Sequence, residues 1–535
     1  MTSSPQLDTD RRTTVDSKLG TGPSHGLRRH LGRLDMVLLT IAATLGIDTI
    51  AEIATGGGLE SLTWVVILAV TFLFPYGLLI SEAGSTFRQE GGPYVWVRLA
   101  FGRYAGGLAS LLYWVTNPIW LGGSLAFIAA ATWNAHIAPL PAGSLSDILF
   151  KLSFVWLAIG IAIISIRFGK ILINIGAIVK VGLLAVLVLT AALYALQHGV
   201  QPMDASLLRP TAGGFLTIAP VLLFALLGFE AANGAAEEMR NPKRDVPRAI
   251  GAAGLTSAVC HLLPILALLA VLPADTLSGD SGILDALGEA FSVYGPAQPV
   301  LLWLSAVALL YIVLTQGSAW MIASDRVQAV SGADGAFPQY FGRFNTALGT
   351  PLRVNMLSGV ISTAFTLVAT WVATSSSSSA FSVVLSVATT TLLLSYLLIL
   401  PSVLRLRRRF PDVERPYVVP GGRWGAVVAT VITLFWIIIG SFVALAPGVL
   451  EQMMGLPYDF GEQWGVSRLA VESLTLGTLG VLLAAHTIGY LFARHHRCVN
   501  HDGLTAEQLL ENGFSEVTRT VRLARASAPE GAPRR

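Results

Sequence analysis

The sequence has 535 residues, of which 53% are hydrophobic and only 13% are charged. A soluble domain usually carries about 25% charged residues, so the composition excludes an ordinary soluble protein. The net charge of +3 and the two cysteines indicate neither a nucleic-acid partner nor a framework of disulfide bonds. The apolar residues form long blocks, each close to the ~20 residues that cross a bilayer as a helix. Because backbone groups in lipid must be satisfied within their own segment, we expect an all-α membrane protein.

The apolar blocks predict twelve membrane-spanning helices in chain order. The spans are expected near residues 35–55, 62–83, 104–134, 149–167, 171–196, 214–239, 248–273, 297–325, 353–373, 380–401, 424–446 and 473–493. The polar segment 1–34 lacks the apolar core of a cleaved signal peptide, so we expect the first span to stay as an anchor. Residues 35–401 then hold ten spans, residues 402–493 a loop and two further spans, and residues 494–535 a polar tail.

The lysines and arginines orient these spans. If both termini are cytoplasmic, 31 of the 35 basic residues fall on the cytoplasmic side, and only Lys151, Arg209 and Arg468 fall outside. The remaining one, Lys180, lies inside a span. Such an excess of positive charge marks the cytoplasmic side of membrane proteins. We therefore expect a multi-pass protein of the cell membrane with both termini in the cytoplasm.

Two of the predicted spans contain a glycine close to an acidic residue in mid-block. Span one has Gly46 before Asp48, and span six has Gly228 before Glu230. Carriers of small solutes interrupt helices at matching positions of two inverted repeats, where polar backbone then faces the solute. The spacing predicts repeats of spans one to five and six to ten, with discontinuous helices one and six. The alternative is that each glycine only allows close helix packing, which is common in membranes.

Four ionisable residues lie inside the predicted spans, namely Asp48, Glu52, Lys180 and Glu230. An ionisable residue at the centre of a membrane helix costs about 2.5–3.5 kcal/mol on insertion scales, so such residues indicate function. Lys180 has apolar neighbours on both sides, and burial disfavours the charged form of a lysine. We expect Lys180 to be a proton-coupling site that faces spans one and eight. The alternative is a fixed ion pair with Asp48 or Glu52.

Other ionisable residues favour simpler interpretations. Glu82, Glu237 and Glu238 lie at span ends, where we expect them to face the membrane interface. The cluster His495–Cys498 is interpreted as a basic membrane-flanking patch rather than a metal site. The sequence has no His-Glu-x-x-His metal motif, and we expect neither an enzyme nor a bound metal or cofactor.

Four sequence patterns together resemble the amino acid–polyamine–organocation permease superfamily. They are Ser81–Gly84 with Glu90–Val97 after span two, Lys180 in span five, Gly228–Glu230 with Ala236–Ile250 after span six, and Asp334–Pro338 with Gly349–Pro351 after span eight. The resemblance covers about residues 30–450. The loop Tyr94–Val97, together with Tyr113–Val115, is similar to the glutamate/GABA antiporter branch.

The resemblance implies a LeuT-like fold, with a five-plus-five inverted repeat and a transport core over residues 35–401. It implies a secondary active permease for an amino acid, with proton-coupled symport or exchange by alternating access, surrounded by membrane lipid. The implied substrate-binding residues are Gly46, Ile47, Asp48, Tyr113, Phe224, Gly228, Phe229, Glu230 and Trp320. The implied proton-coupling residue is Lys180, which matches the lysine that replaces a sodium ion in proton-coupled members.

The resemblance also assigns a role to each part of the site. Amides of the first break, Gly46–Asp48, would bind a substrate carboxylate, and carbonyls of the second break, Gly228–Glu230, would bind its amine. Phe224 and Tyr113 match gating aromatic residues, and Trp320 matches a tryptophan that stacks on the substrate.

Asp48 departs from the family pattern, because many members read Gly-x-Gly at the first break. At ~4 Å and an effective dielectric constant near 20, two like charges repel by about 4 kcal/mol. We therefore expect Asp48 to be protonated, to pair with Lys180, or to face a substrate amine. The last case makes an amine or polyamine carrier the alternative function. A non-transporting nutrient sensor is a third, since the long polar tail permits one.

Overall fold

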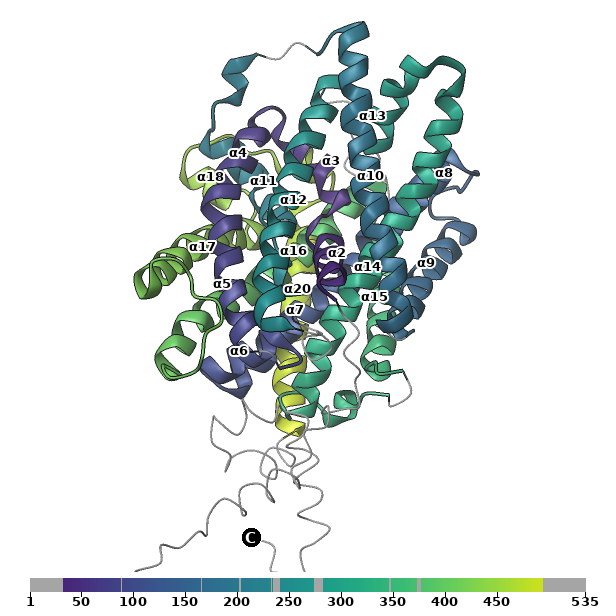
Figure 1. The fold of residues 1–535 in the computed structure, drawn as a ribbon. Helices are drawn as coiled ribbons and strands as arrows, with labels where there is room; N and C mark the ends of the chain where they lie inside the picture. The colour runs from purple at the N-terminus through teal and green to yellow at the C-terminus, as the bar shows by residue number, and fades with distance from the viewer. Residues whose placement is uncertain are drawn as a thin grey trace, which may run out of the picture.

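The computed structural model describes residues 32–87, 89–164, 166–201, 204–231, 233, 241–273, 282–345, 348–372 and 377–493. This part of the chain is helical and contains no strand. Within it, twelve helices are long and apolar enough to cross a membrane. Most of them run along a common direction and form one bundle (Figure 1). The prediction of an all-α protein with twelve spans is therefore confirmed.

The first five spans contain several interrupted helices. Their elements are α2 (Arg33–Thr44) and α3 (Ile47–Gly57), then α4 (Glu60–Leu68), η1 (Ala69–Leu73) and α5 (Phe74–Thr86), then α7 (Arg103–Trp120), η2 (Leu121–Leu125) and α8 (Ala126–His136), then α9 (Leu145–Ile163), and α10 (Ile166–His198). The short helix α6 (Gly92–Phe101) connects the second and third spans.

The remaining seven spans are mostly single long helices. They are α11 (Ala212–Ala225), α12 (Pro242–Val271), α14 (Gln298–Ala333), α15 (Leu352–Val372), α16 (Ser377–Arg409), α17 (Gly422–Leu445) and α20 (Arg468–Phe492). The connectors contain α13 (Gly282–Ala290), α18 (Val449–Met453), α19 (Phe460–Trp464) and the short 3₁₀ helices η3 (Ala205–Leu208), η6 (Phe291–Ala297) and η7 (Gln339–Gly342).

Spans one and six are discontinuous, as predicted. In span one, α2 ends at Thr44 and α3 begins at Ile47. In span six, α11 ends at Ala225, and the chain leaves the helix before Gly228. The two interruptions lie five spans apart, which is the arrangement of a five-plus-five inverted repeat. The predicted end of span six, with the motif residues 236–240, lies outside the described residues, as do the residues before 32 and after 493.

Spans two and three each contain one π-helical segment. The segment η1 ends three residues before Tyr76, and η2 begins directly after Trp120. A π segment widens a helix by one residue and often lies at a functional site. Both segments therefore mark side chains with special positions, namely Trp120 and Tyr76, and the sequence patterns did not select Tyr76.

Span eight extends further than the sequence indicated. Its predicted end was residue 325, but α14 continues to Ala333. The reason is that Arg326 is buried and donates to Glu90 (2.6 Å) and to the carbonyl of Gly349 (3.0 Å). The last turns of α14 are therefore covered by the chain's own loops, and the end of the apolar block does not end the helix.

The interpretation of Glu82 as an interfacial residue was wrong. Its carboxylate is buried, accepts hydrogen bonds from Arg407 (2.6 Å to Nε) and from the amide of Val419 (2.9 Å), and lies 3.6 Å from Arg415. The segment after α16 folds over the end of span two and removes Glu82 from solvent. Glu237 and Glu238 lie outside the described residues.

Replacement of Glu82 by glutamine tests this buried ion cluster. Removing one partner of a buried ion pair costs about 3–5 kcal/mol, because the other charges stay buried without compensation. We expect a clear fall in the thermal unfolding midpoint of the purified protein in detergent.

The matched control is Glu414→Gln. Its pair with Lys243 (2.7 Å) leaves the glutamate 76% exposed, and such a pair contributes at most about 1 kcal/mol. Equal unfolding midpoints for the two variants would contradict a stabilising role of Glu82.

Candidate functional site

The first helix break exposes carbonyl groups, which two side chains satisfy. The last carbonyls of a helix have no partner within it. The ammonium of Lys180, on α10, donates to the carbonyl oxygens of Ala42 (3.1 Å) and Leu45 (2.6 Å). The indole of Trp320, on α14, donates to the carbonyl of Ala43 (2.9 Å). A cation at the C-terminal end of a helix is also favoured by the helix dipole.

On the other side of the same break, Asp48 occupies the first turn of α3. Gly46 is the N-cap of that helix, and Ile47 is its first residue and is buried. The carboxylate of Asp48 accepts hydrogen bonds from the indole of Trp120 (2.8 Å) and from the amide of Gln316 (2.9 Å). The helix dipole favours a negative charge at this position. Asp48 therefore lies where the family resemblance expected a substrate carboxylate.

Gln316 joins the two charged groups of the break. Lys180 donates to its side-chain oxygen (2.6 Å), and its nitrogen donates to Asp48. A glutamine amide has one accepting and one donating end, so it can serve both ions at once. Glu52 lies one turn further along α3, where it accepts a hydrogen bond from Ser382 (3.2 Å) on α16. The bridging amide stands in place of a direct ion pair.

The second helix break is shaped by Gly228. This residue has φ = 120°, a conformation that side chains rarely adopt. A Cβ atom on it would lie 2.8 Å from the ring of Trp320. Trp320, which caps the first break, therefore packs directly on the second one and holds the two interruptions together.

Tyr76, on α5, is the central polar residue of the second break. Its hydroxyl accepts the amide hydrogens of Gly228 (3.0 Å) and Phe229 (3.1 Å) and donates to the carboxylate of Glu230. The hydroxyl of Tyr396, on α16, lies 3.1 Å from that of Tyr76. One tyrosine thus satisfies two free amides and an acid that the broken helix would otherwise leave unpaired in the membrane interior.

Two buried polar groups of this cluster lie beside each other. One carboxylate oxygen of Glu230 and the hydroxyl of Tyr113 interact with each other without forming a hydrogen bond of regular geometry. Tyr113 lies within electrostatic range of Glu230, and its ring is 6.0 Å from that of Trp320. Buried polar groups normally have partners. An acceptor and a hydroxyl side by side could bind an amino or guanidino group of a ligand.

The aromatic candidates do not all face the same space. Phe224 contacts Trp120 edge-on, with ring centroids 5.7 Å apart, and it is thereby linked to Asp48. Phe229 instead stacks on Tyr76 (5.2 Å) and packs against Gly254 of α12. The structure therefore brings the predicted residues around the two breaks, with the Phe229 ring between Tyr76 and α12. Which of them bind a substrate stays a prediction.

Sequence reasoning missed four polar residues of this region. They are Gln316, Tyr76, Tyr396 and Asp325; the last accepts hydrogen bonds from Trp114 (2.8 Å), Ser358 (2.7 Å) and Asn355 (2.5 Å). A search for uncharged polar side chains within apolar blocks would have found Gln316. Among the described residues, no group of three or more His, Cys, Asp or Glu side chains is placed to hold a metal ion.

The fold and this site define a class of protein, a multi-spanning transporter with interrupted helices. Its structure is similar to that of a manganese transporter of Eremococcus coleocola, with a TM-score of 0.56 at 11% identity, over 92% of this chain and 98% of that one. At this identity the likeness concerns the fold alone. Residues 31–456 match the amino acid permease family. The chain belongs to that family, which is part of the amino acid–polyamine–organocation superfamily.

Individual relatives extend over most of the chain. An uncharacterized transporter of Legionella pneumophila is 29% identical over 74% of this chain and 85% of its own. The probable agmatine/putrescine antiporter AguD of Lactococcus lactis is 27% identical, covering 83% and 92%. The branched-chain amino acid permease BcaP of Bacillus subtilis is 23% identical, covering 84% and 96%. The protein is therefore a membrane permease and not an enzyme; the glutamate/GABA branch stays a prediction.

Gly228→Ala tests the contact between the two breaks. The new Cβ atom meets Trp320 in a backbone conformation that costs other residues about 1–3 kcal/mol. We expect little or no uptake by proteoliposomes containing this variant. Gly251→Ala on α12 is the control, because no atom lies within 4 Å of its added Cβ. Normal uptake by the Gly228 variant would show that Trp320 need not approach this backbone.

Proposed function

We propose that this protein is a secondary active transporter for an amino acid, driven by protons and working by alternating access. The observation that carries the proposal is the position of Lys180, whose three hydrogen bonds all end at the first helix break or at Gln316. A group that gains and loses a proton there acts directly on the segment that would bind the substrate.

The coupling follows from the number of donors on Lys180. A protonated amine has three N–H groups, and each hydrogen bond from a charged donor is worth about 1.5–3 kcal/mol. These bonds hold α2 and Gln316 against α10. Loss of the proton removes the charge and one donor, so the break is held less tightly. Proton release thereby favours movement of α2 relative to α10 and α14.

We place both termini and the basic loops in the cytoplasm, on the basis of the lysine and arginine distribution. Residues 35–401 then form the transport core in the cell membrane. Spans eleven and twelve, within residues 402–493, and the terminal segments 1–34 and 494–535 lie outside that core. The proton and the substrate are the soluble partners in this scheme, and lipid surrounds the bundle.

Lys180→Ala tests proton coupling. Uptake of a labelled amino-acid panel into proteoliposomes should respond to an imposed pH gradient in the parent protein and not in the variant. Substrate binding, followed by thermal shift, separates loss of coupling from loss of binding, since bound ligand raises stability by mass action. Full gradient-driven uptake by the Lys180 variant would end the coupling proposal.

Lys151→Ala is the matched control. Lys151 is also a buried lysine, but it pairs with Asp147 (2.8 Å) and lies over the ring of Phe127 (3.8 Å), away from both breaks. We expect this variant to lower stability without changing the response to the pH gradient.

A second candidate function is transport of an amine or polyamine. The observation that favours this candidate is the position of Asp48. Its carboxylate lies at the N-terminus of α3, where an amino-acid carboxylate would bind. The buried carboxylate of Glu230 at the second break adds a second acceptor for a cation. The similarity to a probable agmatine/putrescine antiporter agrees with this candidate.

Competition and substitution at Asp48 separate the two candidates. If amines are the substrate, putrescine and agmatine should compete for uptake. Asp48→Asn should then weaken the binding of these amines by about tenfold or more, which is ~1.4 kcal/mol. If amino acids are the substrate, these amines should not compete. Glu52→Gln is the control on the same helix, because Glu52 lies one turn after Asp48 and accepts a hydrogen bond from Ser382.

A further inference from the structure

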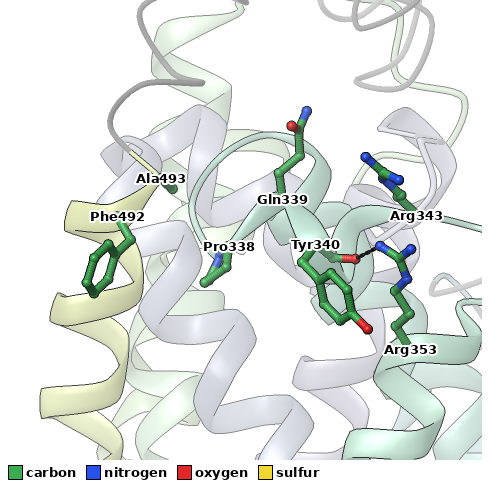
Figure 2. A pocket seen from close by; sticks show the side chains of 7 residues that line it. All are labelled: Pro338, Gln339, Tyr340, Arg343, Arg353, Phe492 and Ala493. Carbon is green, nitrogen blue, oxygen red and sulfur yellow. Dashed lines mark hydrogen bonds between the residues drawn. The ribbon is translucent and has the colours of Figure 1, made fainter.

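A separate pocket of about 570 Å³ lies at the end of the bundle where α14 and α20 finish and α15 begins. Figure 2 shows the side chains that line it, which are Pro338, Gln339, Tyr340, Arg343, Arg353, Phe492 and Ala493. This is the end of the molecule that also carries the arginines Arg407–Arg409 at the end of α16. None of the lining residues belongs to the two helix breaks.

Among the described residues, the pocket lining includes two arginines and no acidic side chain. Arg353 donates one hydrogen bond to the carbonyl of Tyr340 (2.8 Å), and its guanidinium lies 4.0 Å from the centre of the Tyr340 ring (Figure 2). Arg343 is exposed, and neither arginine forms an ion pair within the described residues. The nearby carboxylate of Asp334 is already held by two other arginines.

Both guanidinium groups therefore keep N–H donors that face one pocket. A guanidinium has five donors in a planar fork that matches the oxygens of a phosphate. Arg353 uses one of its donors and stacks on Tyr340, which fixes the direction of the rest. The chemistry that this arrangement favours is a phosphate group or another oxyanion.

The rim of the pocket is apolar and faces outward from the bundle. Phe492 is 78% exposed and Tyr340 is 61% exposed. The apolar surface continues from the pocket along both neighbouring helices, with Ile488 one turn before Phe492 on α20, and Met356 one turn after Arg353 on α15. In a membrane-spanning bundle, such exposed apolar surface contacts lipid chains.

We propose that this pocket binds the headgroup of an anionic phospholipid. The phosphate lies between Arg343 and Arg353, and the acyl chains follow the apolar surface of α15 and α20. A soluble anion would use the arginines but leave the apolar rim without a partner. Anionic lipids are enriched in the cytoplasmic leaflet, and basic pockets between membrane helices on that side bind their headgroups.

A bound headgroup would connect three parts of the chain. Arg353 belongs to the first turn of α15, Arg343 follows η7, and Phe492 ends α20. The loop between α14 and α15 would thereby be fixed to the last helix. Because α14 carries Gln316 and Trp320, a lipid at this place restrains one end of a helix that lines the helix breaks.

The test is lipid binding by the full-length purified protein in a neutral detergent. Phosphatidylglycerol and phosphatidylcholine with identical chains are titrated, and bound lipid is counted by native mass spectrometry. We expect tighter binding of phosphatidylglycerol. The double variant Arg343→Gln with Arg353→Gln should weaken the binding of phosphatidylglycerol by about 30-fold, or about 2 kcal/mol at ~1 kcal/mol per arginine. The binding of phosphatidylcholine should stay unchanged.

Two matched variants control for charge and for folding. Arg408→Gln with Arg423→Gln removes the same charge from exposed positions at the same end of the bundle, so it should keep the preference. Arg343→Lys with Arg353→Lys keeps both charges and should retain most of the binding. If both glutamine pairs lose the preference equally, the attraction comes from general surface charge, and the proposal is overturned.

Two further results would also overturn it. Inorganic phosphate that binds as tightly as phosphatidylglycerol would make the pocket a site for soluble anions. No preference for phosphatidylglycerol in the parent protein would show that the pocket does not select an anionic headgroup. The test involves neither uptake nor proton coupling, so its outcome is independent of the proposed function.

Discussion

Every backbone amide and carbonyl inside a membrane needs a hydrogen-bond partner, and the rest of this structure depends on how that need is met where two helices are broken. The carbonyls of the first break are held by Lys180 and Trp320, and the amides of the second by Tyr76. These side chains come from spans that are distant in sequence. The contacts that satisfy the broken backbone in lipid also assemble the candidate site. A change in one of these contacts therefore changes both the helix breaks and the site.

The two breaks differ in charge. The first holds one basic and one acidic group, Lys180 and Asp48, joined through the neutral amide of Gln316. The second holds one acidic group, Glu230, beside tyrosine hydroxyls. With all three groups ionised, the region has one more negative charge than positive. Such a site attracts the cationic end of a substrate more strongly than the anionic end, and deprotonation of Lys180 increases that difference.

Much of the architecture could be predicted because membrane helices follow simple rules. Apolar length and the positions of basic residues located twelve spans, and glycines close to buried acids located both breaks. Glu82 was misjudged because its cover comes from a segment more than three hundred residues away. Tyr76 and Gln316 were missed for a related reason: their importance lies in partners such as Glu230 and Asp48, which only the fold brings near.

The π segments of spans two and three have a consequence for how this site could vary among related chains. Each segment contains one residue more than a regular helix of the same rise requires. One residue corresponds to a rotation of about 100° around the helix axis. Deleting a residue from η1 would therefore turn Tyr76 away from the second break, although every residue of the break itself would be unchanged. The site therefore depends on the number of residues in these two helices as well as on which residues they contain.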